Sequence, residues 1–342
     1  LGVEERSFLG TGVALGAGVA ASRDQVAYNI YLSDRHFLDS KFGLHVEGIY
    51  AEASESFGEH YLPGPIAENA FGRYEQLDYR RAGIRLGSGY NLLADYFFWF
   101  DYRFENIVTD EPVVVEGGIY QDPTRDEPVV RGFLEPDASA LSAFLFGFQR
   151  DTTNHPVMPF DGSSSELSIT ISSPVLGSSY NYAKFLLQHR QYIPFGRRGQ
   201  SICLSGIAGL ITGTAPFFEQ FFVGDFSSLV PDRRLGLNFS NLHPRVLNTA
   251  IVDVWYEDMV LSLGAEYQFP FYRGSGSIYA VNGFISFGAY AITSAHRIDE
   301  AGVPLDITGD LGIRIDTAVG VFSLSFVNVL QLIPPIRKET TR

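Results

Sequence analysis

The stretch Asp95 to Glu105, DYFFWFDYRFE, decides the fold of this 342-residue chain. Side chains of a β-strand alternate between two faces, so the segment would have one aromatic face and one mixed, charged face. The first carries Tyr96, Phe98, Phe100, Tyr102 and Phe104, and the second carries Phe97, Trp99, Asp101, Arg103 and Glu105. Five consecutive rings on one face are rare in a protein core, but Tyr and Phe gather where strands cross membrane interfaces. The segment therefore predicts a strand of a transmembrane β-barrel.

The same two-residue period recurs along the whole chain. It is clean over residues 42–50, 81–90, 166–172 and 311–316, and weaker over 11–22, 25–37, 138–150, 180–194, 201–213, 258–270, 278–293 and 320–333. Polar residues such as Glu47, Arg81, Arg85 and Arg314 stay opposite an apolar face. Strands of a soluble sandwich, the alternative fold, are usually about five or six residues long. We predict an all-β fold, an antiparallel transmembrane β-barrel with roughly thirteen visible strands, as one domain over residues 1–342.

The connections between these strands alternate in length. Short ones fall at residues 92–94, 196–200 and 273–277, and long ones at 57–76, 109–137, 215–253 and 294–306. Outer-membrane barrels have short periplasmic turns and long external loops. The pattern therefore indicates the bacterial outer membrane.

Composition excludes several other classes of protein. No run of eighteen apolar residues exists, which argues against helical membrane spans, and the net charge of −14 argues against nucleic acid. The seven histidines lack zinc-site spacing, and no nucleotide or nucleophile motif is present. We expect no metal, no cofactor and no catalytic residue. A hydrolase in the barrel wall, using His45 or His189 with a nearby serine and carboxylate, stays open as an alternative.

Two segments resemble the outer-membrane barrel superfamily that contains BamA and TamA, which inserts other β-barrels. The turn DTTNHPVMPFDG has the family pattern at Asp151, Pro156, Pro159 and Gly162. The segment PFFEQFFVGD, residues 216–225, resembles the start of the family's long sixth external loop and includes Phe217, Glu219, Phe221 and Gly224. The resemblance implies that this loop, residues 215–253, folds into the lumen.

The chain also departs from the family pattern. In the family, an arginine at the loop tip meets an aspartate of a Phe-x-Asp-x-Gly strand. Here Val230 stands at the arginine position, and the strand contains Phe284, Ser286 and Gly288, with Ser286 in place of the aspartate. Arg233 or Arg234 could enter the lumen instead. We expect residues 216–240 to touch the strand near Phe284 and Ser286.

The chain contains a second copy of the loop-tip motif, which we do not assign to the family's sixth loop. Residues 130–133, VRGF, spell the family's tip but precede the Asp151 turn, whereas the family's tip follows that turn. We interpret residues 130–133 as a surface loop.

The resemblance implies a BamA-like assembly factor, which pairs client strands with the edge of a barrel seam and needs no catalytic residue. Its partners would be outer-membrane lipids, unfolded outer-membrane protein clients and accessory lipoproteins, with no nucleic acid. The strand count further suggests a truncated 16-stranded barrel without periplasmic domains. The alternative is a secretion translocator or passive pore, whose selectivity would be set by Arg81, Arg85, Arg103, Lys184 and Arg190.

Overall fold

The computed structural model describes most of the chain. The described residues are 2–5, 12–21, 25–34, 36–58, 73–110, 113–116, 134, 137–155, 158–196, 199–222, 256–274, 276–294, 298, 305–318 and 320–329.

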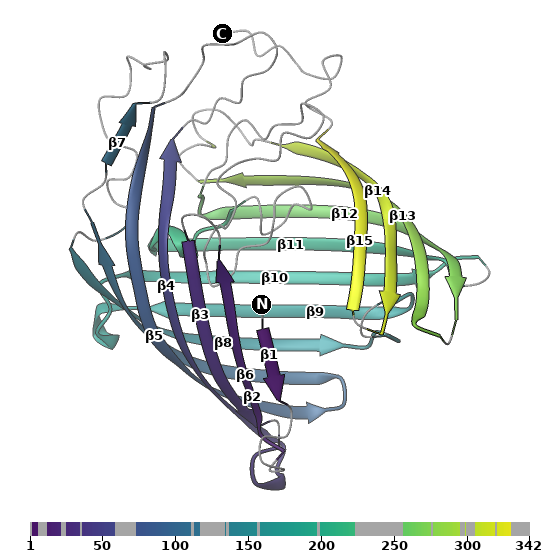
Figure 1. The fold of residues 1–342 in the computed structure, drawn as a ribbon, viewed down its shortest axis with the longest axis horizontal. Coiled ribbons are helices and arrows are strands. Elements are labelled where there is room, and N and C mark those ends of the chain that lie inside the picture. Colours follow the sequence, from purple (N-terminus) through teal and green to yellow (C-terminus); the bar gives the residue numbers. More distant parts are fainter. Residues whose placement is uncertain are drawn as a thin grey trace. The chain divides into compact units, whose positions relative to one another are not determined.

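Fifteen β-strands account for nearly all regular structure in these residues (Figure 1). They are β1 (Gly2–Glu5), β2 (Ala14–Ala21), β3 (Gln25–Asp34), β4 (Phe42–Gly58), β5 (Arg73–Leu93), β6 (Tyr96–Thr109), β7 (Val113–Glu116), β8 (Ala138–Asp151), β9 (Gly162–Ser172), β10 (Asn181–Pro194), β11 (Ser201–Thr214), β12 (Met259–Arg273), β13 (Ile278–Thr293), β14 (Asp306–Thr317) and β15 (Gly320–Val329). The 3-10 helices are η2 (Phe37–Asp39), η3 (Pro174–Leu176) and η4 (Phe217–Glu219). No helix in the described residues is long and apolar enough to cross a membrane.

The strands follow one another in the sheet in chain order, from β1 at one end to β15 at the other. The exception is β7, which pairs with β5 off this path. The successive pairs from β1 to β6 and from β11 to β15 run antiparallel, as neighbouring arrows in Figure 1 show. An antiparallel order with hairpin connections is what the alternating loop lengths predicted.

The apolar face of the strands is the exposed one. Phe98 and Phe100 on β6 are 41% and 40% exposed, and Leu167 and Ile171 on β9 are 41% and 42% exposed. On the opposite face, Arg81 is only 4% exposed. This is the reverse of a water-soluble protein, where charged side chains are seldom buried and large apolar surfaces are seldom exposed.

The predicted all-β class is confirmed, with differences of detail. Thirteen of the described strands have eight or more residues and coincide with the predicted ones. The sequence missed β1 and β7, because four residues are too few to show a period. The short connection predicted at residues 92–94 is present but begins later, because β5 continues to Leu93 and the turn follows it. A register shift between Asn91 and Leu93 breaks the alternation and hides that extension.

The strands group into two compact units. Unit 1 contains Leu1–Gly147, Ser168–Phe185 and Ile211–Tyr256, and unit 2 contains Phe148–Leu167, Leu186–Leu210 and Glu257–Arg342. Strands β8 to β11 each contribute residues to both units. The interpretation of the chain as a single barrel domain stays a prediction.

Two adjacent residues of β10 allow a matched test of whether the exposed apolar face contacts lipid. Leu187 is 48% exposed, whereas Gln188 belongs to the opposite face. We expect Leu187→Arg to lower the free energy of unfolding in phospholipid vesicles by about 2–4 kcal/mol, because an arginine on a lipid-facing strand must be taken out of water. Gln188→Arg should change it by less than about 1 kcal/mol. Urea titration of vesicle-inserted protein measures both, and equal effects would contradict a lipid-facing surface at Leu187.

Candidate functional site

The aromatic segment of residues 216–222, PFFEQFF, is the most buried stretch outside the strands among the residues that the structure describes. We call it the anchor segment. Phe217, Phe218, Phe221 and Phe222 are between 0% and 3% exposed. Pro216 has an extended backbone and precedes η4, whose turn is closed by hydrogen bonds from the Glu219 amide to Pro216 O and from the Gln220 amide to Phe217 O. The tight turn allows successive side chains of a short segment to point in different directions.

The rings of two tyrosines, Tyr79 and Tyr256, hold the anchor segment against the ionic face of unit 1. Phe217 meets the ring of Tyr79 on β5 edge-on, with centroids 5.3 Å apart, and Phe218 stacks on Tyr79 at 6.4 Å. Phe217 and Phe222 both contact the ring of Tyr256, with centroids 5.2 Å and 5.0 Å away. The Tyr256 hydroxyl donates a hydrogen bond to Glu55 on β4. Such ring pairs add about 0.5–1.5 kcal/mol each beyond area burial.

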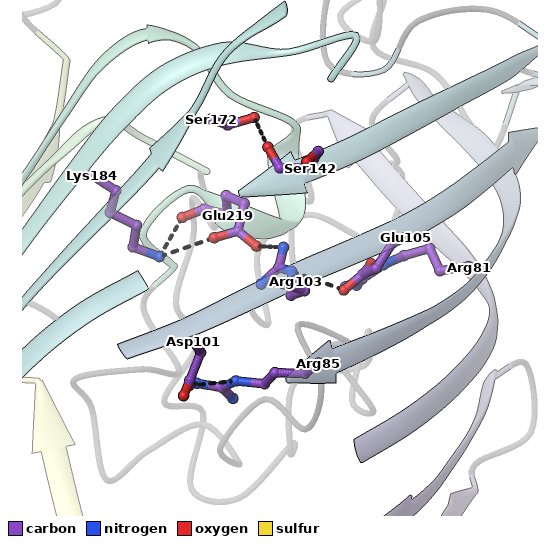
Figure 2. Close-up of polar contacts among 9 residues, drawn as sticks. All are labelled: Arg81, Arg85, Asp101, Arg103, Glu105, Ser142, Ser172, Lys184 and Glu219. Atoms are coloured by element: carbon purple, nitrogen blue, oxygen red, sulfur yellow. Dashed lines mark hydrogen bonds and ion pairs between the residues drawn. The ribbon is translucent and has the colours of Figure 1, made fainter. Parts of the chain in front are cut away.

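An ionic chain of alternating sign ties the segment to the strands, as Figure 2 shows. Glu219 accepts a short charged hydrogen bond from Arg103 on β6, and the Glu219 backbone oxygen accepts another from Lys184 Nζ on β10 at 2.6 Å. Arg103 Nε lies 3.0 Å from Glu105 Oε1. Glu105 Oε2 in turn lies 2.8 Å from the guanidinium of Arg81 on β5. Each carboxylate therefore lies between two cations.

Aromatic rings complete the surroundings of two of these cations. The Arg81 guanidinium lies over the Phe218 ring, 3.8 Å from its centroid, and Lys184 Nζ lies 5.1 Å from the centroid of Phe221. A cation over a ring face is stabilised by about 0.5–2 kcal/mol. The anchor segment thus contributes both a carboxylate and rings to the same set of positive charges.

Two glycines on β5 explain how these ion pairs form. In the register of β5 and β6, Gly83 lies opposite Glu105 and Gly87 lies opposite Asp101. A Cβ atom at Gly83 would lie 2.6 Å from Glu105 Cγ, and one at Gly87 would lie 2.2 Å from Asp101 Oδ1. The glycines leave room for the carboxylates, which Arg81 and Arg85 then reach from two residues away; Arg85 Nε donates to Asp101 Oδ2 at 2.8 Å.

The electrostatics keep Glu219 ionised. Burial alone would raise the pKa of the Glu219 carboxyl, but the positive charges of Arg103 and Lys184 outweigh that effect and lower it to about 2. The chemical capacity of this arrangement is to neutralise buried charge and to fix residues 216–222 on the strands.

A second ionic cluster lies in unit 2, at the strand where the sequence lacks the expected aspartate. Ser286 on β13 lies opposite Glu266 on β12 and Asp310 on β14. Arg314 on β14 reaches over the Phe284 ring, 4.0 Å from its centroid, and makes two hydrogen bonds to Glu266, at 2.5 Å and 2.7 Å. The carboxylate missing at Ser286 is thus supplied by a neighbouring strand, and the cation over Phe284 comes from the wall.

The predicted turn after β8 is held by its own polar side chains. Asp151 accepts hydrogen bonds from the amide and hydroxyl of Thr153, and the Asn154 side chain accepts bonds from the amides of Phe160 and Asp161. Gly162 has φ of +97°, and a Cβ atom there would lie 2.2 Å from Thr152 O, so glycine is required. Pro159 is among the described residues, whereas Pro156 lies outside them.

The predicted loop residues fall partly inside and partly outside the described residues. Phe217, Glu219 and Phe221 belong to the anchor segment described above. Gly224, Val230, Arg233 and Arg234 lie outside the described residues, as do residues 130–133. The contact expected between residues 216–240 and the strand of Phe284, Ser286 and Gly288 therefore stays a prediction, because residues 223–240 lie outside the described ones.

The histidines considered for a hydrolase have the following contacts. His189 Nδ1 lies 2.8 Å from Ser165 Oγ, and within the described part of the chain no carboxylate contacts this pair. His45 Nε2 lies 3.6 Å from Glu47 Oε2 and its ring lies near that of Tyr31, with no serine bonded to it among the described residues. No group of three or more His, Cys, Asp or Glu side chains in the described ranges could hold a metal ion.

Removing the charge of Glu219 should lower the stability of the folded chain. In Glu219→Gln, Arg103 and Lys184 lose their shared counter-charge, and we expect the free energy of unfolding to fall by about 3 kcal/mol. Glu166→Gln is the control, because Glu166 on β9 is a half-buried carboxylate of the charged face with no ion pair among the described residues. Urea titration measures the free energy of unfolding of both variants. If Glu219→Gln loses no more stability than Glu166→Gln, the role of the ionic chain is contradicted.

The lowered pKa of Glu219 also predicts a pH dependence. Because the folded-state pKa is about 2 and the ordinary value is 4.5, the stabilisation is complete above about pH 4.5 and is lost as the pH falls toward 2. The difference in unfolding free energy between the wild type and Glu219→Gln should therefore shrink by about 3 kcal/mol between pH 5 and pH 2. Urea titrations at pH 6, 4, 3 and 2 measure it; a constant difference would mean that Glu219 is not held ionised.

Comparisons with known proteins place this geometry in a family. A model of the Omp85 superfamily domain matches residues 7–330. The chain is similar to the crystal structure of BamA from Haemophilus ducreyi lacking POTRA domains 1-3, with a TM-score of 0.65 and 15% identity over 96% of this chain and 63% of that one. It is also similar to CdiB from Escherichia coli, with a TM-score of 0.62 and 11% identity over 96% of this chain and 55% of that one.

The chain spans less than two thirds of the length of either of these structures. No curated protein sequence matches it. The two structural matches show a shared fold, and the family model covers nearly the whole chain. The chain therefore belongs to the Omp85 superfamily.

Proposed function

We propose that this chain is an outer-membrane β-barrel that assembles other outer-membrane β-barrel proteins, as a BamA-like factor. Its family and its structural neighbours support an outer-membrane barrel of the Omp85 superfamily. The observation that carries the finer proposal is the anchor segment fixed on the charged face of β5, β6 and β10. A barrel with a segment fixed on that face by ion pairs and rings is better suited to act through its wall than to conduct through its lumen.

The proposed mechanism uses the backbone rather than a catalytic side chain. Among the strands that the structure describes, the order ends at β1 and at β15. The edge of an end strand presents N–H and C=O groups to which an extended client segment can add as a further strand. Pairing is strongly favoured in lipid, where an unpaired backbone group costs several kcal/mol. The partners of this mechanism are unfolded outer-membrane protein clients, membrane lipids and accessory lipoproteins.

The side chains that would set the selectivity of a passive pore give that alternative less support. Four of the five, Arg81, Arg85, Arg103 and Lys184, each face a carboxylate or a carbonyl oxygen within the described residues. A neutralised cation attracts passing anions weakly, because the field of its partner cancels most of its own. The likeness to CdiB keeps a secretion translocator as the second candidate.

Assembly activity can be measured directly on this chain. It is inserted into phospholipid vesicles, a urea-unfolded small outer-membrane barrel is added, and folding of the client is followed by its heat-dependent gel mobility. We expect folding at least about tenfold faster than with empty vesicles, which corresponds to a barrier lower by about 1.4 kcal/mol. A rate equal to that of empty vesicles would contradict the proposal.

Proline variants test whether the end strands act as the template. Val3→Pro with Leu324→Pro removes a backbone donor from β1 and from β15, so the acceleration should be lost. Val3→Ala with Leu324→Ala keeps the donors and should retain it. Heat-dependent mobility of the chain itself shows that each variant is folded. Steady large openings in a planar bilayer would favour the passive pore instead.

A further inference from the structure

Three polar side chains and a glycine lie in one row on the exposed apolar face of unit 2. They belong to four successive strands, and are Arg150 on β8, Ser165 on β9, His189 on β10 and Gly206 on β11. Each is an even number of residues from an exposed apolar side chain of its own strand, and these side chains, between 41% and 48% exposed, are Phe146, Leu167, Leu187 and Leu204. Because side chains alternate along a strand, the row faces the same way as they do. Arg150 and His189 are themselves exposed.

Hydrogen bonds bring the three polar side chains together. The Thr152 amide donates to Ser163 O at 2.8 Å, so Arg150 lies opposite Ser165, two residues further along each strand. His189 Nδ1 lies 2.8 Å from Ser165 Oγ. If the serine donates to Nδ1, the His189 Nε2–H is left to donate outward, and if Nδ1–H donates, the serine hydroxyl is left. In either case the pair keeps a donor for a further acceptor beside the guanidinium.

Gly206 leaves an open space beside this pair. The Phe195 amide donates to Gln200 O at 2.9 Å, and in the same register His189 lies opposite Gly206. Among the described residues, a Cβ atom added at Gly206 would meet only Leu263 Cδ2, at 3.6 Å. The row therefore ends in a recess next to the imidazole, with room for a group that is bound to the donors.

The row is a polar island in an apolar surface. On β10, Leu187 precedes it, and Ile193 and Phe195, which are 42% and 54% exposed, follow it. No Asp or Glu occupies the outward positions next to the row on any of the four strands. Polar and charged groups that face hydrocarbon are unfavourable unless they are paired. This surface therefore needs a polar partner, and the charge of Arg150 requires that partner to be an anion.

The position of the row along the strands indicates where the anion comes from. Arg150 is the last residue but one of β8, and Ser165 is the fourth residue of β9. At this end of the strands β10 and β11 are joined by one of the short connections, residues 195–200. Short connections of outer-membrane barrels face the periplasm, and the membrane leaflet on that side consists of phospholipid. The anion within reach is therefore a phospholipid phosphate.

We propose that the row is a binding site for the phosphate of an anionic phospholipid of the phosphatidylglycerol type. The phosphate meets Arg150 and the pair of Ser165 and His189, since a guanidinium with a neighbouring donor suits phosphate oxygens. The head group occupies the recess at Gly206, and the acyl chains lie along Leu187 and its apolar neighbours. An ammonium group would find no carboxylate here, which disfavours a zwitterionic head. The site rests on the outer-membrane location in the proposed function and not on assembly activity.

Native mass spectrometry of the detergent-purified chain tests the site. Phosphatidylglycerol and phosphatidylethanolamine with identical acyl chains are added in equal amounts, and the retained lipid is counted. We expect phosphatidylglycerol to be retained in preference, and Arg150→Gln to reduce its retention at least about tenfold. Arg80→Gln is the control and should retain the lipid as the wild type does, because Arg80 on β5 is also an exposed arginine but lies opposite the carboxylate of Glu52.

The donor pair and the recess are tested with two further variants. Ser165→Ala with His189→Phe removes both donors, and Gly206→Leu fills the recess, so each should lower the retention of phosphatidylglycerol. Heat-dependent gel mobility confirms that the variants are folded. Equal retention by Arg150→Gln and Arg80→Gln would overturn the site, as would a wild-type chain with no preference between the two lipids. Displacement of the lipid by an excess of inorganic phosphate would assign the row to a soluble anion and overturn the lipid as its occupant.

The outcomes also distinguish this site from the assembly proposal. A chain that retains phosphatidylglycerol as expected but does not accelerate client folding would refute assembly and support the site. A chain that accelerates client folding but shows no difference between Arg150→Gln and Arg80→Gln would refute the site and support assembly.

Discussion

The alternation of side chains along the strands is the constraint on which the rest of the structure depends. It directs ionisable residues to one face and exposes apolar residues on the other, with Phe98 and Phe100 about two-fifths exposed while Arg81 is buried. Such a surface is stable in hydrocarbon and unstable in water, because exposing apolar area to water costs about 25 cal/mol per Å². The opposite face then has to compensate its buried charges locally.

Compensation follows the same pattern in both units. In unit 1, Arg81 is paired with Glu105 and lies over the Phe218 ring; in unit 2, Arg314 is paired with Glu266 and lies over the Phe284 ring. Each guanidinium thus has a carboxylate at its edge and a ring at its face, which satisfies both its charge and its planar shape. A guanidinium that lost its carboxylate would be left as an uncompensated buried charge, which is strongly destabilising.

The same pairing of a guanidinium with a carboxylate and a ring explains how this chain can differ from its family. The resemblance places an arginine on the loop tip and an aspartate on the strand of Phe284, and this sequence has Val230 and Ser286 there. Glu266 and Arg314 supply the two charges from neighbouring strands, so the Phe284 ring has its cation without one from the loop. The described beginning of the loop is fixed by Glu219 and the rings of the anchor segment.

The sequence by itself determined the class of fold, the positions of the thirteen long strands and the face of each residue, because these follow from a local period of two. It also placed the Asp151–Gly162 turn, whose hydrogen bonds are within the turn. It could not give the pairing of Glu219 with Arg103 and Lys184, which are 116 and 35 residues away in the chain. That pairing depends on how the segment after β11 lies on β6 and β10, and on the register that places their cations side by side; register is a property of the sheet, since shifting it by two residues leaves every side chain on its face but changes every partner.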